Sequence, residues 1–210
     1  MIIPLNPDNQ KHVEATAKLH KELLNESPIV QLGDIFMKEI YYSSLVKAKL
    51  FQCDLYYHNG EYVGFISYTS DPLHFMQKSV KIFFLRLFYI VFKSVILKPS
   101  LAKTVINVCR EMMQRKSLSS QIDDRDLGEM LSLGVIKEGC KLVDADTGKR
   151  VPNLLFEGAI KYFKENSIKK YRLFVLKTNP EALLFYLSYG GKIIDDQCAG
   201  GKSYLIEFIV

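Results

Sequence analysis

Apolar and polar positions follow helical spacing near the N-terminus. A short apolar run at residues 2–5 precedes a turn-forming cluster at residues 6–8, and the next segment has apolar residues at Val13, Ala17, Leu19, Leu23 and Leu24. Residues three and four positions apart share one face of an amphipathic helix. A second periodic stretch, about residues 30–45, follows a breaker at residues 26–28. The chain is therefore expected to begin with a strand and two helices.

Strand spacing replaces helical spacing from residue 50. The runs 50–58 and 61–69 are rich in β-forming residues and are joined by Asn59-Gly60, a pair typical of tight hairpin turns. Gly64, inside the second run, predicts a bulge or a close backbone approach. We expect an antiparallel hairpin here.

The stretch from about residue 73 to residue 115 is predicted to be a helical insertion with an unusually apolar surface. Charged residues interrupt it too often for a membrane span. Four basic residues share one sector of a helical wheel: Lys78, Lys81, Arg86 and Lys93. Large apolar patches are rarely left exposed. The apolar residues of the insertion are therefore expected to pack against one of three surfaces: the domain's own core, a second copy of the chain, or an anionic membrane surface bound through residues 78–98.

The second half of the chain alternates strands and helices. Strands are expected at residues 129–136, 171–176, 192–195 and 203–210, and helices at about 151–166 and 180–189. This alternation implies crossover connections and parallel strand pairing. The predicted class is α+β: a mixed sheet flanked by helices, in one domain of residues 1–210, with the helical insertion between the third and fourth strands.

Composition narrows the classes of function. The formal net charge of +5 comes from basic residues spread along the chain, which suits a small anionic ligand better than nucleic acid. The four cysteines lack the CxxC spacing of a zinc or dithiol site, so no metal site is expected. The N-terminus turns polar after a short apolar stretch, and we expect a cytoplasmic protein.

Three segments resemble the GCN5-related N-acetyltransferase (GNAT) family. Residues 128–135 look like its central strand, residues 146–155 sit where it carries a pyrophosphate loop, and residues 178–191 resemble its motif of Asn, two residues, Ala, two residues and Phe-Tyr. The family loop usually has Gln or Arg, two residues, Gly, one residue, and then Gly or Ala, whereas here only Gly148 is present and Val151-Pro152 occupies the later positions. A second departure is Gly191, where the family usually has Phe. The resemblance implies direct transfer of the acetyl group of acetyl-CoA to a primary amine of a small molecule or peptide.

Residue by residue, the resemblance implies two catalytic groups and a cofactor site. Glu129 would be the general base, and Tyr186 the general acid that protonates the leaving thiolate. Alternation along the strand places Glu129 on the face of Leu131 and Leu133. Phosphates suit the unpaired N–H groups at a helix start. The cofactor-binding residues expected are Leu133, Val135, Gly148, Lys149, Arg150, Val151, Asn153 and Asn179.

The residues alone leave other interpretations open. Glu129 could be a solvated carboxylate, Tyr186 a packed core tyrosine, and Asn179 a helix N-cap before Pro180. A rival function is a catalytically silent module that binds acyl-CoA or a partner protein. In either case the insertion is predicted to form a lid or wall of the acceptor site and to contribute to a homodimer.

Overall fold

The structure is a computed structural model that describes residues 1–72, 75, 78 and 126–210. The predicted insertion at residues 73–115 therefore lies outside the described residues, apart from Phe75 and Lys78.

A mixed seven-stranded sheet organises the described part of the chain, with the strand order β1-β2-β3-β4-β5-β7-β6. Its strands are β1 (Ile2–Pro4), β2 (Gln52–His58), β3 (Glu61–Thr69), β4 (Leu127–Val135), β5 (Lys170–Leu176), β6 (Lys192–Gln197) and β7 (Ser203–Ile209). Strands β4 and β5 are parallel, whereas the other neighbouring pairs are antiparallel. The α+β class is confirmed. The expectation of repeated parallel pairing was wrong, because β7 inserts between β5 and β6.

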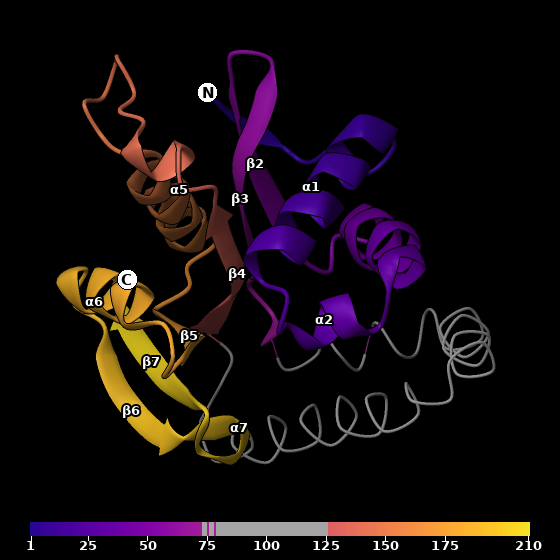
Figure 1. Cartoon of the computed structure of the whole chain (residues 1–210). Helices are drawn as coiled ribbons and strands as arrows, with labels where there is room; N and C mark the ends of the chain where they lie inside the picture. Colours follow the sequence, from indigo (N-terminus) through magenta and orange to yellow (C-terminus); the bar gives the residue numbers. More distant parts are fainter. Residues whose placement is uncertain (73–74, 76–77, 79–125) are drawn as a thin grey trace.

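Helices cover both faces of the sheet (Figure 1). One face carries α1 (Gln10–Leu23), α2 (Pro28–Gln31) and the π-helix η1 (Phe36–Leu45). The opposite face carries α5 (Val151–Glu165) and α6 (Pro180–Ser188), and a separate core cluster lies on each face. Two short helices, η3 (Gly139–Lys141) and α7 (Cys198–Gly201), complete the described elements. We refer to the two faces as the α1 face and the α5 face.

The predicted hairpin is confirmed as β2 and β3. Asn59 and Gly60 have φ of 47° and 90°, the positive values that a type I′ hairpin turn requires. The expected irregularity near Gly64 is also present. The register shifts there, and a Cβ on Gly64 would lie 2.9 Å from a methyl group of Val135.

The single helix expected over residues 30–45 is wrong. Gly33, with φ of 96°, ends the short helix α2 before η1 begins. Because a positive φ interrupts a right-handed helix, the apolar periodicity continues across a break in the backbone. Helix η1 is π-helical over ten residues, although π-helices usually occur as single turns, frequently at functional sites.

Among the helices of the described ranges, none combines the length and the apolar character that crossing a membrane requires.

Candidate active site

The parallel strands β4 and β5 separate partway along their length. Leu127–Met130 of β4 pairs with Lys170–Leu173 of β5. Beyond these residues β4 continues to Val135 and β5 to Leu176 without pairing to each other. In the described part of the chain, one edge of β4 is therefore open from Leu131 onward.

A bulge at Leu131 lies at the start of this separation. Ser132 pairs with Ser67 of β3, and Met130 pairs with the next residue of β3, so Leu131 is the extra residue on β4. The bulge changes which side chains share a face. Met130 and Leu133 pack with the core of the α5 face, while Leu131 packs with the core of the α1 face.

Simple alternation predicted that Glu129 and Leu133 share a face of the sheet. Because of the bulge, they do not. Gly128, the neighbour of Glu129, faces Phe163 of α5, so Glu129 points to the other side of the sheet. The Arg172 Nε on β5 donates to Glu129 Oε2 at 3.1 Å, and the two side chains are only 8% and 7% exposed. The solvated-carboxylate interpretation is therefore wrong.

The buried ion pair makes Glu129 a poor candidate for the general base. A proton taken up by Glu129 would leave the guanidinium of Arg172 buried beside a neutral partner, which is energetically costly. The geometry favours a structural role for this pair, and the catalytic role of Glu129 stays an untested prediction.

Backbone groups of β4 point toward its open edge. The Ile136 N–H donates to the Val63 carbonyl of β3 at 2.9 Å. Because the direction of hydrogen bonding alternates along a strand, Leu133 and Val135 direct their N–H and C=O groups away from β3. The Val135 carbonyl accepts a weak S–H contact from Cys140 at 3.7 Å. These two residues are the ones that the resemblance assigned to the arm of CoA.

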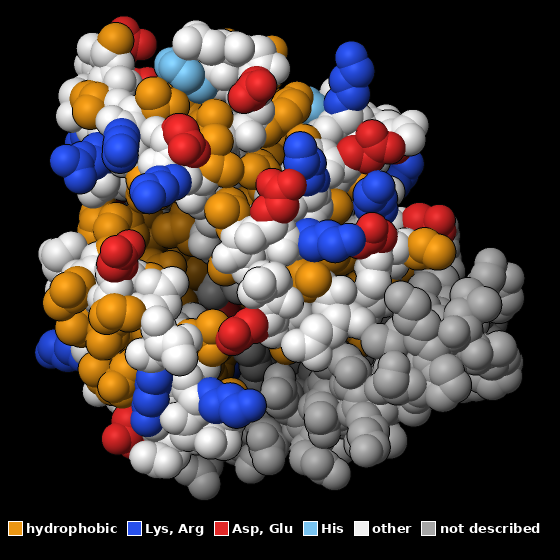
Figure 2. Space-filling view, in the orientation of Figure 1, with side chains coloured by type: hydrophobic (Ala, Val, Ile, Leu, Met, Phe, Trp, Pro, Cys, Tyr) orange, Lys and Arg blue, Asp and Glu red, His pale blue; other side chains and the backbone are white. Residues whose placement is uncertain are grey.

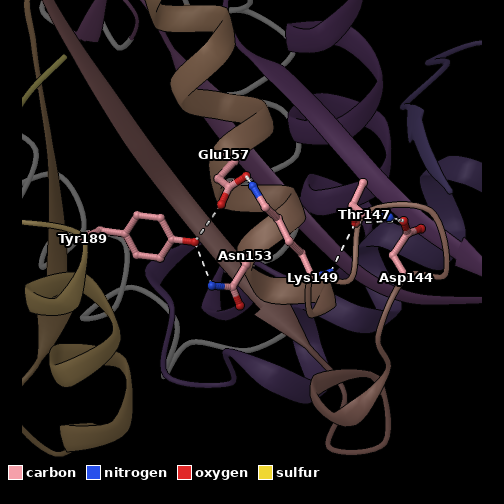
Figure 3. A network of polar contacts seen from close by, with 6 residues as sticks. All are labelled: Asp144, Thr147, Lys149, Asn153, Glu157 and Tyr189. Atoms are coloured by element: carbon pink, nitrogen blue, oxygen red, sulfur yellow. Dashed lines mark hydrogen bonds and ion pairs between the residues drawn. The ribbon is translucent and has the colours of Figure 1, made fainter.

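The loop before α5 forms a closed turn (Figure 3). The Thr147 N–H donates to Asp144 Oδ1 at 3.0 Å, the Gly148 N–H to the Asp144 carbonyl at 2.9 Å, and the Lys149 N–H to Thr147 Oγ1 at 3.3 Å. The Val151 N–H also donates to a loop carbonyl, at 3.3 Å. The backbone donors expected around Gly148 are thus engaged within the loop. Phosphate binding here would depend on the first turn of α5 and on side chains.

Side chains at the start of α5 are linked to the end of α6 (Figure 3). Asn153 Nδ2 donates to the Tyr189 hydroxyl at 2.7 Å, and that hydroxyl donates to Glu157 Oε1 at 3.2 Å. Lys149 Nζ lies 2.6 Å from Glu157 Oε2, and this bond raises the pKa of Lys149. The structure therefore brings the predicted residues Lys149 and Asn153 together, through two residues that the sequence analysis missed. Arg150 is the exposed residue immediately before the helix.

Asn179 is the N-cap of α6. Its Oδ1 accepts the Ala182 N–H at 3.0 Å, and Pro180 occupies the first helical position. This confirms the N-cap interpretation of Asn179, and its predicted contact with CoA remains a prediction.

The cap gives a direct test of the helix end. Replacing Asn179 with alanine should lower the free energy of unfolding by about 0.5–2 kcal/mol, because an orphan N–H of the first turn loses its acceptor. Chemical denaturation measures this change. Glycine at position 179 should cost only a few tenths of a kcal/mol; an equal loss for both variants would contradict a capping role.

Tyr186 is buried on the α5 face. It is 8% exposed and its ring centroid lies 5.5 Å from that of Phe156. Tyr186 belongs to the core cluster against which Leu133 and Val135 pack. Burial raises the pKa of Tyr186 well above that of an ordinary phenol, which makes it a weaker proton donor in this conformation. Its role as general acid stays a prediction.

Gly191 has a packing explanation. A Cβ at this position would lie 2.7 Å from Phe208 Cζ and 2.7 Å from Ile206 Cγ2. The Phe208 ring fills the space that a larger side chain at position 191 would need, so the departure from the family motif is compensated by β7.

A buried polar pair on the α1 face was not predicted. His20 of α1 and Tyr42 of η1 are both fully buried, with His20 Nδ1 and the Tyr42 hydroxyl 2.5 Å apart. The sequence analysis did not single out His20. A usable signal was present, because His20 is three residues after Ala17 and four before Leu24, on the apolar face of the predicted helix.

Figure 2 shows a hollow with apolar side chains between the regions of α5 and α6. The hollow is compatible with a ligand that passes between the two helices.

Comparison with known proteins identifies the fold. No family model and no curated protein sequence matches the chain. Among solved structures, PaiA N-acetyltransferase from Thermoplasma acidophilum in complex with coenzyme A aligns with a TM-score of 0.54 at 15% identity, over 100% of this chain and 98% of its own. Arabidopsis thaliana NAA60 in complex with acetyl-CoA gives 0.56 at 15% identity, with the same coverage. A GNAT-family acetyltransferase from Streptococcus pneumoniae gives 0.54 at 16% identity, again over 100% and 98%.

The chain has the fold of the GCN5-related N-acetyltransferases. The predicted fold resemblance is thereby confirmed, and the mixed sheet with its separated β4–β5 pair is the feature on which the functional argument rests.

Proposed function

We propose that this protein transfers the acetyl group of acetyl-CoA to a primary amine of a small molecule or peptide. The observation that carries the proposal is the open edge of β4 where β5 separates from it, in a fold shared with structures that hold coenzyme A or acetyl-CoA. An extended amide-containing chain can pair with the free backbone groups of such an edge.

The residues present fit such a ligand in two places. Leu133 and Val135 offer backbone groups to the amides of the arm, and the first turn of α5 offers the partial positive charge of a helix N-terminus to its phosphates. Lys149 and Arg150 add full positive charges beside that turn. Lys149 is paired with Glu157. To bind a phosphate, Lys149 must therefore exchange the carboxylate of Glu157 for the phosphate.

Acetyl-CoA supplies an activated acyl group as a thioester. The amine must attack in its neutral form, and the Val135 N–H donates a hydrogen bond to the carbonyl oxygen as negative charge develops there. When the carbon–sulfur bond breaks, Tyr186 gives its phenolic proton to the thiolate. The proton released by the amine restores the phenol, so the overall reaction yields an amide and a thiol.

Binding of the cofactor is the first test. Calorimetric titration with CoA or acetyl-CoA should show saturable binding that weakens as salt is added, because phosphates meet basic groups. Lys149→Ala should bind more weakly, whereas Lys164→Ala, at the exposed far end of α5, should bind like the unaltered protein. Absence of binding at about millimolar ligand, equivalent to less than about 4 kcal/mol, would refute the proposal.

Turnover separates an enzyme from the silent acyl-CoA-binding alternative. A panel of primary amines, both small molecules and peptides, is incubated with acetyl-CoA, and released thiol is measured. Saturable, amine-dependent thiol release is expected. Tight binding of acetyl-CoA with no release for any amine would favour the silent module.

We further propose a cytoplasmic location and a homodimer to which residues 73–115 contribute. The support for the dimer is the sequence of residues 73–115, because large apolar surfaces are rarely left exposed to solvent. Light scattering should give twice the chain mass of 24.1 kDa, and a monomeric mass would refute the dimer. Sedimentation with anionic liposomes tests the alternative of membrane contact through residues 78–98.

A further inference from the structure

Some buried polar atoms on the α1 face have no hydrogen-bond partner among the described residues. His20 Nε2 and Ser67 Oγ are enclosed and unpaired, and both residues are 0% exposed. Leaving a buried donor or acceptor unsatisfied costs about 1–3 kcal/mol, and such groups are uncommon enough to need an explanation. Stability alone would favour apolar residues at both positions.

The histidine ring is held by its neighbours. His20 stacks on Phe65 with ring centroids 5.4 Å apart, and Tyr41 and Tyr42 of η1 meet its ring edge-on at 6.4 and 5.9 Å. The Tyr42 hydroxyl fixes Nδ1, so Nε2 is the ring nitrogen left to interact with another molecule. The π-helix therefore places both tyrosines against one histidine.

Both unpaired atoms lie beside the strand that carries the open edge. Phe65 and Ser67 belong to the same face of β3, and they pair with Gly134 and Ser132 of β4. These β4 residues belong to the part of the strand that β5 does not cover. The polar groups thus neighbour the site of the proposed thioester from the face opposite α5. In the proposed mode of binding the phosphates lie at the first turn of α5, and an amine on the α1 face would approach the thioester from the opposite side of the sheet.

The chemistry of the two groups restricts what they can receive. Burial lowers the pKa of His20 to about 4, so the ring is neutral at physiological pH. A neutral imidazole and a hydroxyl can exchange hydrogen bonds with an uncharged polar group, but they do not offset a full charge in a buried site. The surrounding rings suit a ligand with apolar surface.

We propose that His20 Nε2 and Ser67 Oγ anchor the acceptor substrate by hydrogen-bonding its neutral amine or an adjacent uncharged polar group. This inference rests on the proposed acetyl transfer and names the acceptor side of the same site. Neither atom reaches solvent, so the acceptor reaches them when the enclosing side chains move aside.

The first test compares two hydroxyls on the same face of β3. Thr69 Oγ1 donates to the Leu50 carbonyl at 2.9 Å and accepts the Asp71 N–H at 3.2 Å, whereas Ser67 Oγ has no such partner. Thr69→Val should lower the melting temperature, and Ser67→Ala should leave it unchanged or raise it. A comparable drop for Ser67→Ala would assign its hydroxyl to the fold and overturn the proposal.

The second test uses the best amine from the turnover panel. Ser67→Ala should raise KM for the amine by up to about 10-fold, as expected for one hydrogen bond, without changing the affinity for CoA. His20→Asn keeps a polar atom near the Nδ1 position and lacks one near Nε2; His20→Gln reverses this. We expect a higher amine KM for the Asn variant than for the Gln variant.

The outcomes separate this inference from the proposed function. Unchanged amine KM in Ser67→Ala and His20→Asn, with normal turnover, would overturn the acceptor site and leave acetyl transfer standing. Failure of the unaltered protein to bind acetyl-CoA would instead remove the function itself.

Discussion

Replacing Tyr186 with phenylalanine is expected to lower acetyl-transfer turnover by about 10²-fold or more, the scale of a lost general acid. The substitution removes only the hydroxyl, and the ring stays packed against Phe156. The affinity for CoA should therefore remain nearly unchanged. Steady-state kinetics together with calorimetry on the same preparations would measure both quantities.

Tyr189→Phe is the matched control for this experiment. Tyr189 follows the same helix, but its hydroxyl bonds to Asn153 and Glu157 at the start of α5. Its loss should alter cofactor affinity more than turnover at saturating acetyl-CoA. Full turnover in Tyr186→Phe would reduce Tyr186 to a packing residue.

Replacing Arg172 with leucine is expected to destabilise the protein by about 3–5 kcal/mol, because the buried carboxylate of Glu129 loses the positive charge of Arg172. The side chain of Glu129, which accepts the Nε–H of Arg172, is itself 7% exposed. Urea denaturation followed by circular dichroism would give the change in the free energy of unfolding. This loss is a large share of the total stability of a typical domain.

The control for Arg172 is a more exposed ion pair that begins two positions earlier on β5. Lys170 Nζ lies 3.0 Å from Glu207, with the lysine side chain half exposed, and Lys170→Ala should cost less than about 1 kcal/mol. A similarly small cost for Arg172→Leu would show that the buried pair does not stabilise the sheet. Glu129 would then again be a candidate for the general base.

The parts of the fold that follow local rules could be predicted from the sequence. Asn59-Gly60 adopts the positive φ values of its turn, and Asn179 and Pro180 begin α6 where the capping pattern placed it. The helix α5 begins at Val151, as expected. In each case the information lies within a few adjacent residues, so no distant contact is needed to read it.

The features that escaped prediction depend on pairing between distant segments. The bulge at Leu131 is defined only by the register of β4 against β3, and it reverses the facing that alternation gave for Leu133 relative to Glu129. The partner of Glu129 lies 43 positions away on β5. The loop before α5 is closed by hydrogen bonds to Asp144, and the single glycine of this loop, Gly148, did not predict them.

The π-helical backbone of η1 determines how this segment responds to a change in chain length. In an α-helix 3.6 residues complete a turn, whereas a π-helix bonds each residue to the fifth along the chain and so holds more residues in each turn. Deleting one residue between Phe36 and Tyr41 would let that turn relax to α-helical bonding with little rotation of the residues that follow. Tyr41 and Tyr42 would keep facing His20. Inserting a residue into an α-helical turn at either end would instead rotate them by about 100° and remove the hydroxyl that orients His20. A single deletion within η1 is therefore expected to be tolerated better than an insertion beside it.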